Sequence, residues 1–195
     1  MKNINIIITG DELADDLNKL FDKHKIKYLK FSKCRGFSAK FSVMEFLGVQ
    51  DIKKTMLAFE TSETKSKTIS RFIRKYFNYK NNGIMFALNG ESAMSEIILY
   101  VAIVNNGKGE KVVDIIRKNA FAGATILDAR GNGLNTEEFF GVEIGSSKEV
   151  VLSAVPQSFQ SAIENAVKNA FKDENSDVVS FVLPISNFDK LHQDK

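Results

Sequence analysis

The residues best suited to binding an anion form a glycine-rich stretch, Arg130-Gly131-Asn132-Gly133. Backbone N–H groups beside glycine can approach an anion closely, and arginine supplies a fork of donors for a phosphate or a carboxylate. The Arg-Gly pair also occurs earlier, at Arg35-Gly36, which favours ligand binding. Glycine is equally what an ordinary turn requires, and that interpretation stays open. The predicted ligand-binding residues are Arg35, Gly36, Arg130, Gly131, Asn132 and Gly133.

The loop that follows carries acidic and aromatic side chains. General acid–base catalysis by its carboxylates would need a pocket and a shifted pKa, and the sequence shows neither. A solvated loop that faces a protein partner is the better interpretation. The aromatic pair Phe139-Phe140 suits docking to a partner and folding back onto a sheet equally well. The predicted partner-facing residues are Glu137, Glu138, Phe139 and Phe140.

Other reactive side chains are sparse. The chain has one cysteine, Cys34, and two histidines without the spacing of a metal pair. We expect Cys34 to be a buried, inert thiol, although its neighbour Arg35 would favour a thiolate. The stretch Asn105-Asn106-Gly107-Lys108-Gly109 lacks the Lys-Ser/Thr ending of a phosphate loop, and we predict a strand-to-helix turn there. We therefore predict no catalytic residue, no metal ligand and no enzyme.

The charge balance limits which classes of partner the sequence predicts. The 195 residues include 27 basic and 24 acidic side chains, for a formal net charge of +3. This balance is close to neutral and no dense basic run appears, so we predict no nucleic-acid partner. The apolar run at the N-terminus is too short for a signal peptide or a membrane span, so we expect a cytoplasmic protein with no transmembrane segment.

Hydrophobic periodicity predicts the elements and their order. When Arg35 is aligned with Arg130, a lag of 130 − 35 = 95 residues, apolar positions of the two halves coincide. The pattern predicts an α+β protein of two tandem ferredoxin-like βαββαβ units, residues 1–92 and 97–195, whose antiparallel sheets have helices on one face. The apolar spacing in the second unit predicts a strand at residues 97–104 and a helix at residues 110–119. Strands are expected to end at Lys33 and at Pro184. Because the other face of each sheet needs a cover, we expect packed halves or a homo-oligomer.

Three segments of the second unit resemble PII-type nitrogen-regulatory signalling proteins. They are Leu99–Val104, Gly123–Gly133 and Ser180–Pro184, the last containing Phe181-Val182-Leu183-Pro184. In that family one strand ends in a glycine-rich turn that opens a long loop, and the last strand ends in a Phe-Val-Leu-Pro-like segment. The resemblance covers roughly residues 97–188. The position of a family lysine before the final strand is Val179 here.

The resemblance implies a non-enzymatic regulator that is usually trimeric. In such proteins a small effector binds between subunits, and the loop reports its presence to a regulated partner protein. For this chain it implies sensing of a small metabolite or an ATP- or ADP-like nucleotide, in nitrogen regulation, without a fixed cofactor. Two alternatives stay open. One is a divalent-metal-binding or metal-tolerance protein of similar fold, and the other is an enzyme on that scaffold.

Overall fold

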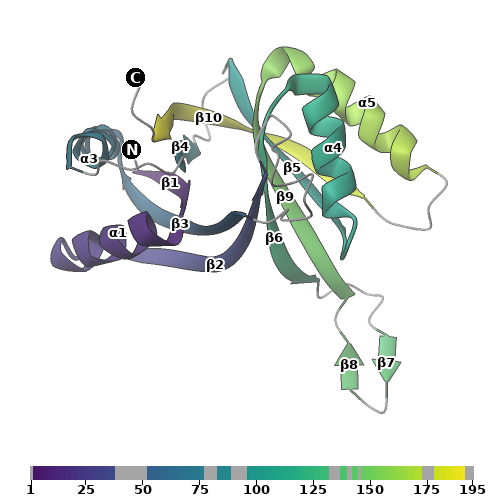
Figure 1. Ribbon diagram of the computed structural model, residues 1–195, viewed down its shortest axis with the longest axis horizontal. Helices are drawn as coiled ribbons and strands as arrows, with labels where there is room; N and C mark the ends of the chain where they lie inside the picture. Colours follow the sequence, from purple (N-terminus) through teal and green to yellow (C-terminus); the bar gives the residue numbers. More distant parts are fainter. Residues whose placement is uncertain are drawn as a thin grey trace. The chain divides into compact units, whose positions relative to one another are not determined.

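The computed structural model describes residues 2–37, 52–76, 83–88, 96–131, 137–139, 142–144, 146–172 and 178–191 (Figure 1). The described strands are β1 (Lys2–Thr9), β2 (Tyr28–Phe37), β3 (Ile52–Ser62), β4 (Gly83–Leu88), β5 (Ile97–Asn105), β6 (Ala124–Gly131), β7 (Glu137–Phe139), β8 (Val142–Ile144), β9 (Ser146–Pro156) and β10 (Val179–Leu191). The described helices are α1 (Asp11–Lys23), α3 (Glu63–Tyr76), α4 (Gly109–Ala120), the 3-10 turn η1 (Gln157–Phe159) and α5 (Gln160–Phe171).

The main strands form one closed antiparallel barrel, in the order β1-β3-β2-β6-β9-β5-β10-β4, while β7 and β8 make a separate two-stranded sheet. The predicted fold class, two tandem ferredoxin-like units with a sheet each and helices on one face, is therefore wrong. Two strands run beyond their predicted ends and close the sheet. Arg35–Phe37 of β2 pairs with β6, and Ile185–Leu191 of β10 pairs with β4. Closure satisfies backbone groups that separate sheets would leave unpaired at their edges.

The chain divides into two compact units, and neither is a continuous stretch of sequence. Unit 1 comprises residues 1–34, 52–97 and 184–195, and unit 2 comprises residues 35–51 and 98–183. The strands β2 and β10 each contribute one part to each unit. Figure 1 colours the chain by residue number, so the course of β2 and of β10 can be followed in it.

The core of unit 1 lies where β1, β3 and β4 meet α1 and α3. Strand β1 pairs with both β3 and β4, and Ile7, Leu57 and Met85 are buried there. Helix α1 contributes Leu17 and Phe21 at a spacing of four residues, which places them on one helix face. These side chains form a continuous apolar core between helix and sheet.

The core of unit 2 is likewise formed by one apolar face of each helix. Helix α4 buries Val112 and Ile116, and α5 buries Ile163 and Val167, again at a spacing of four residues. Tyr100 of β5 is among the largest fully buried side chains of the structure. Within the described part of the chain, no helix is long and apolar enough to cross a membrane.

The first residues of strand β2 contact helix α1, within unit 1. Tyr28 packs edge-on against Phe21 of α1, and Lys30 binds Asp15 of the same helix, so even-numbered residues face α1. Lys33, further along the strand, has a left-handed backbone with φ of 67°, which is uncommon for a residue other than glycine.

Candidate functional site

The glycine-rich stretch begins at the end of a paired ribbon of two strands. Strands β6 and β9 pair from Thr125–Leu152 to Gly131–Ser146, and Arg130 lies opposite Ser147. The next described segments, β7 and β8, form a hairpin in which Glu137 pairs with Ile144. The first two residues of the predicted anion-binding turn, Arg130 and Gly131, thus belong to the end of this ribbon.

The structure describes these predicted residues only in part. The backbones of Arg130, Gly131, Glu137, Glu138 and Phe139 are placed in strands. Asn132, Gly133 and Phe140 lie outside the described residues, as do the side chains of the strand residues just named. Their predicted ligand-binding and partner-facing roles stay predictions.

The other predicted arginine, Arg35, lies in a cluster of carboxylates within unit 2. Its guanidinium binds Glu149 Oε1 of β9 and Glu110 Oε1 of α4, the latter at 3.2 Å. Asp128 Oδ1 of β6 lies 4.0 Å from Arg35 Nη2. We call these four residues the Arg35 cluster. The cluster contains three carboxylates and one guanidinium. The guanidinium of Arg35 therefore already has carboxylate partners within the chain.

Glu149 joins this cluster to the start of α4. It is 2% exposed, and its Oε2 accepts a 2.6 Å hydrogen bond from the backbone N–H of Gly109. The first N–H groups of a helix lack partners within the helix, and the helix dipole favours a negative charge there. The two oxygens of Glu149 therefore have separate partners, a helix N-terminus and an arginine.

Gly109 makes this approach of the carboxylate possible. A Cβ at residue 109 would lie 2.7 Å from Glu149 Oε2 and 2.9 Å from Ile126 Cδ1. Both distances are shorter than a side-chain contact allows, so a larger residue would push the Glu149 carboxylate away from the N–H. The glycine at this helix start is needed for close contact rather than for an unusual φ.

The turn between β5 and α4 is a strand-to-helix turn, as the sequence predicts. Lys108 N–H donates to Asn105 O at 3.1 Å, and Gly107 has a φ of 81° that glycine adopts without strain. Lys148 Nζ donates to Asn105 Oδ1 at 2.5 Å, and Asn106 N–H donates to Ser147 O. These contacts tie the turn to β9 beside Glu149.

The structure brings together residues that sequence reasoning did not connect. Arg35 lies opposite Ile126 on β6, and Gly36 is buried opposite Thr125, so neither belongs to the turn at Arg130. Glu149 was missed although it has a recognisable signal. A lone acidic residue within a β-branched strand must be paired if its side chain is buried.

Other chemistry is limited within the described residues. Cys34 is buried, as the sequence predicts, and its thiol donates to Phe31 O at 3.3 Å. No group of three or more His, Cys, Asp or Glu side chains in the described ranges is placed to hold a metal ion. The polar groups described above are the charged side chains of the Arg35 cluster and the backbone N–H of Gly109.

No protein-family model matches the chain, and no curated protein is significantly similar to it in sequence. The resemblance to PII-type regulators therefore stays a prediction from sequence motifs.

Proposed function

We propose that this protein is a non-enzymatic regulator that binds a small anionic effector at the Arg130–Gly133 turn. Binding would change the segment that follows, and a protein partner would recognise that change. The observation that carries the proposal is the ribbon of β6 and β9, whose last pair, Gly131–Ser146, lies at the start of this segment.

The ribbon gives the turn a fixed base. Asp128 and Glu149 form a cross-strand pair two positions before Arg130, and both belong to the Arg35 cluster. Through Glu149 the same pair is bonded to the N-terminus of α4. Binding residues commonly lie on loops held by a rigid scaffold, and this arrangement suits that use.

The composition of the turn supports an anionic ligand. Arg130 would supply a guanidinium, and glycine at positions 131 and 133 carries no side chain to keep an anion from the backbone. The resemblance to PII-type regulators supports a nucleotide or a metabolite, with a partner protein as the target. An effector acts as a signal when it binds one conformation of the segment more tightly than another.

The test is a thermal-shift screen of the full chain with ATP, ADP, AMP, a panel of small carboxylic acids, and Mg²⁺ or Mn²⁺ alone. A ligand at 100 times its Kd should stabilise the fold by about 2.7 kcal/mol. We expect an anionic ligand to raise the Tm and Arg130→Ala to remove that increase. The exposed Arg71 on α3 provides the matched control, because Arg71→Ala should leave the increase intact.

Two outcomes would overturn the proposal. A Tm increase with a divalent ion alone, with no response to any anion, would favour the metal-binding alternative. An anion response that survives Arg130→Ala would place the effector elsewhere on the molecule.

A further inference from the structure

A run of basic residues crosses the end of α1 and strand β2. Residues 23–35 contain six basic side chains and no acidic one. The rest of the chain then holds 27 − 6 = 21 basic and 24 acidic side chains, so it is net negative. The whole-chain balance, which predicts no nucleic-acid partner, averages over this local excess. The basic residues of the run are Lys23, Lys25, Lys27, Lys30, Lys33 and Arg35.

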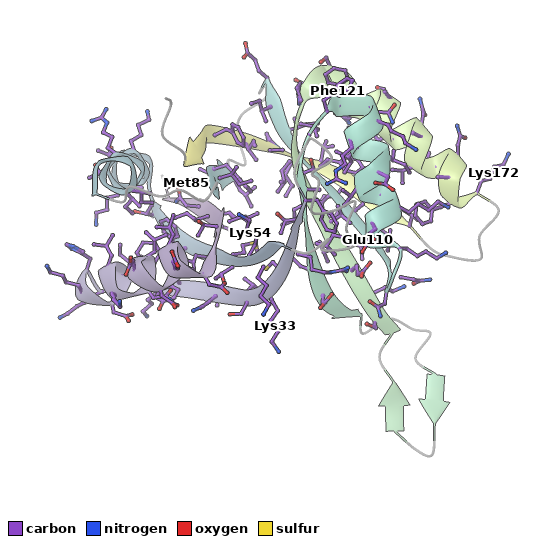
Figure 2. The ribbon with its side chains drawn as sticks, in the orientation of Figure 1. Lys33, Lys54, Met85, Glu110, Phe121 and Lys172 are labelled. Atoms are coloured by element: carbon purple, nitrogen blue, oxygen red, sulfur yellow. The ribbon has the colours of Figure 1, made fainter. Side chains whose placement is uncertain are left out.

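Two large apolar side chains are exposed within this run. Leu29 is 65% exposed and Phe31 is 43% exposed, and the five lysines around them are exposed as well. Two large apolar side chains exposed two residues apart on one strand form a small patch, and such patches rimmed by polar residues mark interaction sites. We call Lys27, Leu29, Phe31 and Lys33 the β2 stripe. Figure 2 shows the side chain of Lys33 pointing away from the ribbon.

The lysines of this run differ in their ion pairing with the described residues. Lys30 faces α1, where it binds Asp15 at 3.1 Å, and the neighbouring Lys19 binds Asp16. Because side chains alternate along a strand, Leu29 and Phe31 lie on the side away from this acidic helix. No described residue forms an ion pair with Lys27 or Lys33. A polyanion would therefore meet two exposed lysines, close in sequence to the apolar pair, that no described residue pairs.

We propose that the β2 stripe binds single-stranded nucleic acid. Lysines on either side of a short exposed segment can contact successive phosphates, and an exposed phenylalanine between them offers a flat face on which a base can stack. A membrane fits the geometry less well. Leu29 and Phe31 lie within a strand of a hydrogen-bonded sheet, whereas insertion into a bilayer surface typically uses an amphipathic helix.

The experiment measures binding of the full chain to fluorescent dT20 and rU20 by anisotropy over a range of salt concentrations. Single strands should bind, and log Kd should rise linearly with log salt concentration. Lys27→Ala/Lys33→Ala should lower that slope by about 1.4, because each phosphate contact contributes about 0.7 for single strands. The matched control, Lys168→Ala/Lys172→Ala, removes two exposed lysines at the end of α5 and should leave the slope unchanged.

Substitutions of Phe31 test base stacking separately from the contacts of lysines with phosphates. Phe31→Ala should weaken single-strand binding at least about fivefold without changing the salt slope, since stacking carries no counterion release. Phe31→Tyr should restore binding, because tyrosine stacks as phenylalanine does. Unfolding curves of each variant check that the fold is retained.

Three results would overturn this proposal. The first is binding of a 20-base-pair duplex as tight as that of the single strands, with no effect of Phe31→Ala. The second is sedimentation with phosphatidylserine vesicles in the absence of single-strand binding. The third is no measurable binding of either oligonucleotide at low salt. None of them affects the effector site, because the stripe and the Arg130–Gly133 turn share no residue.

Discussion

At the scale of single residues, Glu149 places a carboxylate in the buried interior of unit 2. A buried carboxylate is strongly unfavourable unless it is paired and hydrogen-bonded. Glu149 meets this condition through two partners that are far apart in sequence, Arg35 and the N–H of Gly109. Arg35 is therefore needed for stability whatever it contributes to a ligand.

Removing Arg35 should destabilise the protein strongly. Arg35→Ala leaves the Glu149 charge buried without its cation, and breaking one side of such a pair costs about 3–5 kcal/mol. Urea unfolding followed by circular dichroism measures this loss. Combining Arg35→Ala with Glu149→Gln should cost clearly less than the two single losses added together, because the residues are directly coupled. A loss below about 0.5 kcal/mol in Arg35→Ala, typical of a surface change, would contradict this account.

Tyr100 should make the fold sensitive to alkaline pH. Burial raises the pKa of its phenol above the usual value. Because the pKa of Tyr100 is higher in the folded state, its contribution to the free energy of unfolding is fully present below the unfolded pKa of about 10. It is lost as the pH rises through the folded value. Tyr100→Phe should therefore lose less unfolding free energy between pH 9 and pH 11 than the unaltered protein does. Parallel pH profiles for the two proteins would rule out this role.

At the scale of elements, α4 ends in a strained residue. Phe121 adopts the left-handed conformation with φ of 49° and ψ of 35°, and its N–H donates to Arg117 O. Glycine is the usual residue at this position, since a side chain there costs about 1 kcal/mol or more. Phe121 is also 77% exposed and lies at the end of α4 in Figure 2.

Replacing Phe121 should therefore stabilise the protein. Phe121→Gly relieves the backbone strain and removes little buried apolar surface, so we expect a gain of about 1 kcal/mol in urea unfolding. Phe121→Ala keeps the Cβ and serves as the control, with a smaller gain. Destabilisation by Phe121→Gly would instead show that the aromatic ring makes a contact that outweighs the strain.

The sequence predicts individual elements better than their extents. The expected strand 97–104 and helix 110–119 correspond to β5 (Ile97–Asn105) and α4 (Gly109–Ala120). The hairpin of β7 and β8 was expected to be loop, because residues 130–148 are rich in Gly, Asn, Ser and Glu. For two strands the predicted ends, Lys33 and Pro184, came too early. Both strands continue, to Phe37 and Leu191.

At the scale of the whole molecule, those two continuations decide the fold. The segments beyond Lys33 and Pro184 pair with β6 and β4 and close the sheet. Periodicity reports which face of a strand is buried, but it does not report which strand lies beside it. The candidate site shows the same limit. Arg35 was identified from its motif, whereas its pairing with Glu149, 114 residues further on, follows only from the three-dimensional structure.

The division of the chain also sets an order for folding during synthesis. Domains generally fold as they emerge, the N-terminal one first. Here unit 2 is complete once Leu183 has been made, whereas unit 1 still requires the part of β10 that follows. The unit that starts the chain is thus the last to receive all its residues. A chain truncated after Leu183 and released should protect unit 2 from proteolysis and leave the N-terminal residues open to cleavage.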